Sequence, residues 1–115
     1  MVQTKVVYRL EDEDGIGPYS TDLPGVQDYV CVVHRRRAEA GKKLPCPNTD
    51  NGINRQIYPW EVCAFIDKKQ MNEWIADSEI EVLNRMGVKL RRIKAQITAR
   101  GTYQILIKKG GECVY

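Results

Sequence analysis

The fold is decided by residues 59–88, which read PWEVCAFIDKKQMNEWIADSEIEVLNRMGV. Asp67 is a favoured N-cap residue, and Gln70 lies three positions later, as it does in a capping box. These two signals predict a helix that begins at Lys68. Its apolar residues have the spacing that places side chains on one face of a helix, to be buried against a sheet: Met71, Trp74 and Ile75.

A second helix signal follows directly. Ser78 is a suitable N-cap and Glu81 completes its capping box, so we predict a second helix whose buried stripe consists of Ile80, Leu83 and Met86. Gly87 should end this helix, because glycine adopts the left-handed C′ conformation at little cost. Val88, the next residue, is placed to contact Leu83 in a Schellman ending.

Strands are predicted on both sides of the two helices. Residues 61–66, EVCAFI, are apolar after Glu61 and lead straight into the first helix, so we predict a short buried strand there. Residues 88–97 alternate between apolar and polar, but the alternation changes phase at Arg91 and Arg92. One extra residue at that point would restore the phase, which is the sequence pattern of a β-bulge.

Further strands are predicted towards the two ends of the chain. Residues 2–10 alternate well enough for a strand. Near the other end, a turn at 98–101 should lead to a strand over 102–108. The run KGGE at 109–112 then predicts a second tight hairpin, which returns the chain to residues 113–115.

Residues 21–40 carry an ambiguous pattern. Their valines have helical spacing, but the run VCVV is β-branched and would suit a buried strand equally well. We predict a helix, capped by Asp22 and ended before Gly41, because the following HRRRAEA consists largely of good helix formers. Residues 41–58 contain two prolines and few apolar residues, so we predict a long loop of the kind often used for binding.

These elements predict one α+β domain over residues 1–115, with a small, mainly antiparallel sheet and two or three helices packed on one face. The chain has no apolar run long enough to cross a bilayer and no secretory signal, so we expect it in the cytoplasm, with no membrane partner. In that compartment the cysteines should be free thiols: Cys31, Cys46, Cys63 and Cys113.

The formal net charge is only +3, but the charge is unevenly distributed. Residues 85–111 contain eight Lys or Arg and no carboxylate, whereas residues 11–14 are all acidic. We expect the positive side chains to form a surface for an anionic partner, with these as the principal residues: Arg35, Arg36, Arg37, Arg91, Arg92 and Lys94.

Aromatic residues extend this expectation. Tyr19 and Trp60 are candidate anchors for a partner, although Trp60 would fit the core equally well. Tyr103 lies on a basic strand and could stack a base, so nucleic acid is one possible partner. The competing interpretation is that the lysines and arginines of the strands only protect exposed edges from aggregation.

Metal and acid–base sites have weaker signals. Cys31 and His34 form a C-x2-H pair, but Cys46 and Cys63 are too widely separated to be the close second pair of a structural zinc site. A partial D-x-D-G at residues 12–15 lacks the other ligands of a calcium loop, which favours a solvated acidic turn. We therefore predict no metal and no cofactor, and we expect His34 on the surface beside three arginines.

Three segments resemble parts of small proteins encoded by tailed bacteriophages, mostly of unassigned role. They are YRLEDEDGIGPYS at residues 8–20, CAFIDKKQMNEWI at 63–75 and GVKLRRIKAQITARGTYQILI at 87–107. The resemblance implies an accessory phage product that works in the cytoplasm of the bacterial host by binding a host factor, for example a defence nuclease. The leading hypothesis is thus a non-enzymatic protein that binds a host protein or nucleic acid through its charged faces and residues 41–58.

A second resemblance supplies the alternative. Tyr8 and Arg9 on an early strand, with Gln104 on a late one, resemble the arginine and Q-x-E positions of small ADP-ribosyltransferases. In those enzymes the arginine binds the phosphates of NAD, and the glutamate stabilises the developing ribosyl cation. Leu106 stands where that glutamate is required, so the stabilising charge is missing. The alternative is therefore a degenerate, nucleotide-binding domain that uses Tyr8, Arg9 and Gln104.

Overall fold

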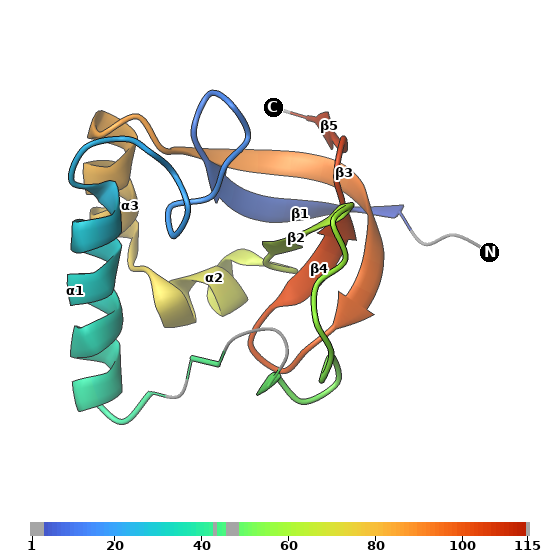
Figure 1. Cartoon of the computed structure of the whole chain (residues 1–115), viewed down its shortest axis with the longest axis horizontal. Coiled ribbons are helices and arrows are strands. Elements are labelled where there is room, and N and C mark those ends of the chain that lie inside the picture. The colour runs from blue at the N-terminus through green and yellow to red at the C-terminus, as the bar shows by residue number, and fades with distance from the viewer. Residues whose placement is uncertain (1–3, 43, 46–48, 115) are drawn as a thin grey trace.

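A computed structural model describes residues 4–42, 44–45 and 49–114 (Figure 1). Within this part of the chain three helices accompany an antiparallel sheet, which confirms the predicted α+β fold. The elements, in order, are β1 (Thr4–Glu11), α1 (Val26–Glu39), β2 (Glu61–Ala64), α2 (Lys68–Trp74), α3 (Asp77–Arg85), β3 (Lys89–Arg100), β4 (Ile105–Lys108) and β5 (Glu112–Cys113). None of the described helices is long and apolar enough to cross a membrane.

The strands form a sheet in the order β1-β3-β4-β2, with all pairs antiparallel. β3 is the longest strand and curves, so that its first half pairs with β1 and its second half with β4 (Figure 1). The sheet curls until Phe65, just after β2, meets Tyr8 of β1 through two backbone hydrogen bonds of 2.9 and 2.8 Å. The strands therefore close into a small barrel.

The sheet buries opposite faces at its two ends. In β1, Val7 is buried in a cluster inside the barrel, whereas Leu10, on the other face, is buried under the helices. Their partners in β3 behave in the same way: Ile93 lies opposite Val7, and Leu90 opposite Leu10. One strand pair thus serves two cores, one between the sheet and the helices and one inside the barrel.

This switch of buried face corrects the predicted bulge at Arg91 and Arg92. The register between β1 and β3 runs without interruption from the Thr4–Gln96 pair to the Glu11–Lys89 pair. The apolar pattern changes phase there because the core changes side, and not because a residue is inserted. The observed irregularity lies further along β3, between Ile97 and Ala99, where it faces β4.

The two short helices follow their predicted signals in part. α2 begins at Lys68, and Asp67 Oδ1 accepts a hydrogen bond of 2.7 Å from the Gln70 backbone, as predicted. α3 begins at Asp77, so the prediction that Ser78 caps it and Glu81 completes the box is wrong. The Glu79 carboxylate accepts a hydrogen bond of 2.7 Å from the Ala76 backbone nitrogen, so the helix starts two residues earlier than predicted.

The other two helix predictions concern an end and a start. Gly87 has φ of 101°, and the Val88 nitrogen donates to the Leu83 carbonyl at 2.9 Å, which confirms the Schellman ending of α3. α1 is a helix, as predicted, but it begins at Val26 after Gly25, so the predicted Asp22 cap is wrong. Gly25 has φ of 77°, and this left-handed turn resets the chain direction after Asp22.

The last strands differ from the prediction. β3 continues to Arg100 and β4 begins at Ile105, so the turn between them covers residues 101–104 and not the predicted 98–101. The predicted hairpin at 109–112 is wrong, because β5 pairs with β3 and not with β4. Gly111 packs onto β3, where an added Cβ would lie 2.5 Å from Ile93 Cγ2, so the chain continues along β3 and does not fold back.

Candidate binding surface

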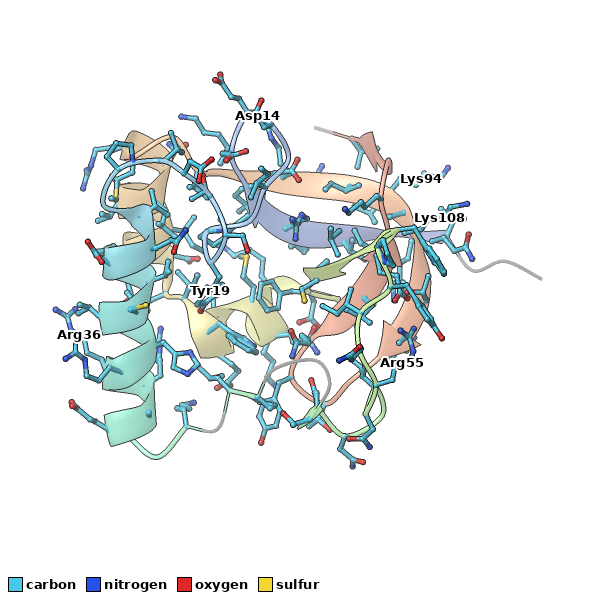
Figure 2. All side chains as sticks on the ribbon, viewed as in Figure 1. Asp14, Tyr19, Arg36, Arg55, Lys94 and Lys108 are labelled. Carbon is cyan, nitrogen blue, oxygen red and sulfur yellow. The ribbon has the colours of Figure 1, made fainter. Side chains whose placement is uncertain are left out.

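The arginines of α1 divide into exposed and paired side chains. Arg35 and Arg36 are exposed, and Arg36 projects from the outer side of α1 in Figure 2. Arg37 is half-buried, donating to the Glu79 carboxylate at 3.0 Å and to the Trp74 carbonyl at 3.3 Å. Arg37 therefore ties α1 to α2 and α3, and only its two neighbours offer charge to a partner.

The predicted cations of β3 lie elsewhere. Arg91 is half-buried, with its Nε 4.0 Å from Glu11 Oε1, whereas Arg92 and Lys94 are exposed. Lys94 and Arg36 lie at opposite ends of the molecule in the view of Figure 2. Lys94 of β3 is thus not a neighbour of Arg36 of α1.

The side chain of Arg9 is bonded within the fold. Its Nη1 donates to the Cys63 carbonyl at 2.6 Å, its Nη2 to the Gly15 carbonyl at 3.2 Å, and its Nε lies 3.2 Å from Glu11 Oε2. These bonds join the loop after β1 to strand β2. The guanidinium thus has structural partners on three sides.

Gln104 and Tyr8 also serve the fold. The Gln104 amide is buried and donates to the Pro45 carbonyl at 2.8 Å, next to the buried carboxylate of Asp50. Tyr8 bridges to Phe65 through its backbone and packs its side chain against the helical core. Gln104 and Arg9 therefore belong to separate hydrogen-bond networks.

The acidic turn after β1 is more structured than expected. Asp12 is buried, and its carboxylate accepts hydrogen bonds from the Thr21 hydroxyl at 2.5 Å and from the Asp14 and Ile16 backbones at 2.8 and 3.0 Å. These bonds, led by the one from Thr21, hold the pKa of Asp12 below its usual value. The turn is therefore organised around one buried carboxylate, and only its outer acids are solvated.

The other candidates from the sequence lie at the helical end. Tyr19 is exposed, with its ring edge-on to His34 at a centroid distance of 6.5 Å. His34 is half-buried against Trp74, so its expected place on the surface is corrected.

Among the described residues no three His, Cys, Asp or Glu are grouped to hold a metal, and Cys31 and Cys63 form no disulfide. Cys46 and the side chain of Cys113 lie outside the described part of the chain.

An exposed stack of aromatic rings lies in the segment before β2. Trp60 is 52% exposed and Tyr58 47% exposed, and their rings stack at 4.7 Å with an angle of 11°. The Arg55 guanidinium lies 4.5 Å from the centre of the Tyr58 ring. We call these three side chains the aromatic platform. Trp60 is therefore on the surface, as the anchor interpretation requires, and not in the core.

A buried carboxylate supports the aromatic platform from below. Glu61 is 3% exposed and accepts two hydrogen bonds of 2.8 Å from the Arg55 guanidinium and one of 2.9 Å from the Tyr58 backbone. The Arg55 hydrogen bonds are the main reason that the pKa of Glu61 falls to about 2. Glu61 thus remains charged at neutral pH and holds Arg55 and Tyr58 in position.

An open groove lined by lysines adjoins the platform. Lys109 donates its backbone N–H to the Trp60 carbonyl at 2.8 Å, and Lys108 lies opposite Glu61 in the β2–β4 pair. Figure 2 shows Lys94 and Lys108 side by side at this end of the barrel. We call it the lysine groove; no described carboxylate is among its lining residues, which are Thr4, Lys94, Ala95, Gln96, Lys108, Lys109, Gly110 and Gly111.

Of these residues, the sequence pattern indicated only Trp60 and Lys94 as members of a site. Arg55 and Tyr58 belong to a loop whose packing no periodic pattern describes. A usable signal was present nevertheless: IYPWE at residues 57–61 places two aromatic residues around a proline at the end of a polar loop. Lys108 and Lys109 were counted in the acid-free segment but were not placed next to Trp60.

Comparison with known protein families gives a match over nearly the whole chain. A family model described as Bacteriophage T4 Y00F protein matches residues 1–113. No curated protein and no solved structure matches the chain at a significant level.

Proposed function

Because the chain belongs to the bacteriophage T4 Y00F protein family, we propose that it is an accessory protein that binds a macromolecule of the bacterial host in the host cytoplasm. The match over residues 1–113 confirms the resemblance to small phage proteins. Interference with a host factor such as a defence nuclease would require only a binding surface. The proposal therefore depends on whether the molecule carries one.

The aromatic platform is the observation that carries this proposal. Trp, Tyr and Arg are the residues that most often dominate binding energy at interfaces, and here one of each is gathered in a single exposed cluster. Glu61 holds the cluster in place before any partner arrives. A surface that is already ordered loses less conformational entropy on binding.

The acidic groups favour binding over catalysis. Three carboxylates of the described chain are buried, and each accepts hydrogen bonds that organise a loop: Asp12, Asp50 and Glu61. A general acid or base must instead reach a substrate, with a pKa near the working pH. The pKa of Glu61, at about 2, lies far from that range.

A capture experiment tests the proposal. The tagged protein is incubated with bacterial lysate, and the captured material is compared between the wild type, Trp60→Ala and Arg36→Ala. We expect Trp60→Ala to reduce capture at least tenfold, because truncating a central aromatic anchor commonly costs 2 kcal/mol or more. Arg36→Ala, at the other end of the molecule, should retain capture.

Capture that is equal in the wild type and Trp60→Ala, with both proteins folded by circular dichroism, would contradict the proposal. Capture lost only in Arg36→Ala would move the binding surface to α1. Treating the lysate with nuclease divides the partners into proteins, whose capture survives, and nucleic acids, whose capture does not.

A further inference from the structure

Resting on the proposed function, we infer that the partner bound at this surface is single-stranded nucleic acid, with a base stacked on Trp60 and phosphates held in the lysine groove. The two sites adjoin, because the backbone hydrogen bond of 2.8 Å from Lys109 to Trp60 joins them. A nucleotide presents a flat ring and an anion close together, and this surface offers a partner for each.

The platform suits an unpaired base. The rings of Trp60 and Tyr58 stack with nearly parallel planes, at 11°, and each residue leaves about half of its surface exposed to solvent. Every base has a π face, so stacking on an aromatic side chain tolerates any sequence. A duplex keeps its bases stacked on one another, which is why this surface should prefer single strands.

The lysine groove suits phosphate. Lys94, Lys108 and Lys109 are exposed, and no described carboxylate lines the groove. The nearby carboxylate of Glu61 is already neutralised by Arg55. Gly110 lines the groove and a Cβ added to it would meet nothing within 4 Å, so an extended backbone has room to approach the lysines.

The helical end lacks this combination. Arg35 and Arg36 are exposed there, but the nearby exposed ring of Tyr19 meets His34 edge-on, at 90°, and forms no stacked platform. Phosphate contacts without stacking give weak, strongly salt-dependent binding. The barrel end is therefore the better site for a single strand.

Fluorescence anisotropy with labelled oligonucleotides tests the inference. The probes are oligo-deoxythymidine and oligo-uridine of about 15 nucleotides and a duplex of the same length. We expect both single strands to bind with similar affinity, because neither the stacked ring nor the lysines contact the sugar. The duplex should bind more weakly, because its bases are already stacked on one another. Binding should also quench the emission of Trp60, since the other tryptophan, Trp74, is buried.

Matched variants locate the site. Trp60→Ala should weaken binding roughly tenfold, as expected for the loss of one stacked base, while Trp60→Phe should retain most of the affinity. With three lysines in contact, log K should fall against log salt with a slope of about −2, and Lys108→Ala should reduce the slope to about −1.4. Arg36→Ala removes the same charge from α1 and should leave the slope unchanged.

The outcomes separate this inference from the proposed function. If neither single strand binds, or if the duplex binds as tightly, the inference is overturned. If at the same time capture from nuclease-treated lysate still depends on Trp60, the proposed function stands and its partner is a protein. If oligonucleotides bind but Arg36→Ala weakens them more than Lys108→Ala, the nucleic acid lies on α1 and the assigned site is wrong.

Discussion

At the helical end of the molecule, Arg35 and Arg36 extend from α1 into solvent, whereas at the barrel end Lys94, Lys108 and Lys109 line a groove beside stacked rings. Both regions are positively charged, but they differ in what supports them. The helical end rests on apolar packing by the buried valines of α1. The barrel end is supported by a half-buried ion pair, in which the buried carboxylate of Glu61 holds the partly exposed Arg55.

The difference shows how a fold can hold charged and aromatic side chains in a fixed arrangement. Long charged side chains on a helix remain mobile and well hydrated, so each contributes little until a partner orders it. At the barrel end, the carboxylate of Glu61 accepts hydrogen bonds from Arg55 and from the Tyr58 backbone, and this arrangement fixes the aromatic platform before binding. Preorganisation, and not the number of charges, distinguishes the two ends.

The largest expected effect comes from removing that support. Glu61→Ala leaves Arg55 and the Tyr58 backbone without their acceptor, and we expect the free energy of unfolding to fall by about 3 kcal/mol. Glu79→Ala, which breaks the corresponding contacts to Arg37 and Ala76, should cost about 1 kcal/mol. Urea denaturation measures both, and equal losses would remove the distinction between the ends.

Protonation of Glu61 at low pH should also lower the free energy of unfolding. The pKa of Glu61 is about 2 in the folded protein against an ordinary value of 4.5, so its contribution is complete above about pH 4.5 and is lost as the pH falls towards 2. We expect this loss to reach about 2 to 3 kcal/mol. In Glu61→Gln the decline should be smaller by that amount, leaving the part due to the other carboxyls whose pKa is lowered, which are Asp12, Glu73 and Asp77. Denaturation curves at several pH values measure the free energy of unfolding of both proteins. The same decline with falling pH in the wild type and in Glu61→Gln would show that Glu61 is not the group responsible.

A smaller effect is expected at the helical end. Arg37→Ala removes the hydrogen bonds to Glu79 and to the Trp74 carbonyl, and it should lower the free energy of unfolding by about 1 kcal/mol. Arg36→Ala removes an exposed side chain and should change it by less than about 0.5 kcal/mol. Thermal denaturation of the two variants makes the comparison. A larger loss in Arg36→Ala would show that α1 uses its exposed charge for stability.

No effect is expected from NAD, the ligand of the alternative hypothesis. Arg9 donates to two backbone carbonyls within the fold, and the Gln104 amide donates to Pro45, so neither is turned towards a ligand in solution. NAD should therefore leave the melting temperature unchanged, since a ligand stabilises a protein only by binding its folded state. A rise in melting temperature that Arg9→Ala abolishes would revive the alternative.

Local signals predicted the helices well where one signal had no competitor. Asp67 and Gly87 mark a start and an end through hydrogen bonds to residues three to five positions away, so the sequence nearby contains both partners. Near Ser78 and Asp22 the sequence offers more than one possible start for a helix. α3 starts after Ala76, with Glu79 as the acceptor, and α1 starts after Gly25. At α3 the Glu79 carboxylate also accepts a hydrogen bond from Arg37 of α1, a contact that the local sequence does not show.

The candidate site shows the same limit. Trp60 and Lys94 were recognisable as an aromatic anchor and a cation, but their neighbours come from a loop and from β4, far along the chain. Within the predicted joint surface of α1 and β3, Arg36 and Lys94 lie at opposite ends of the molecule (Figure 2), which no pattern in the sequence indicated.

The sequence by itself determined the helices, most of the strands and the α+β class, because capping and apolar periodicity act between residues close in the chain. Only the tertiary structure decided that the β1–β3 pair changes its buried face, that the sheet closes through Tyr8 and Phe65, and that Glu61 supports Trp60 beside the lysines. Those features depend on contacts between distant segments, and a single strand pattern does not show which of its two faces a later element will cover.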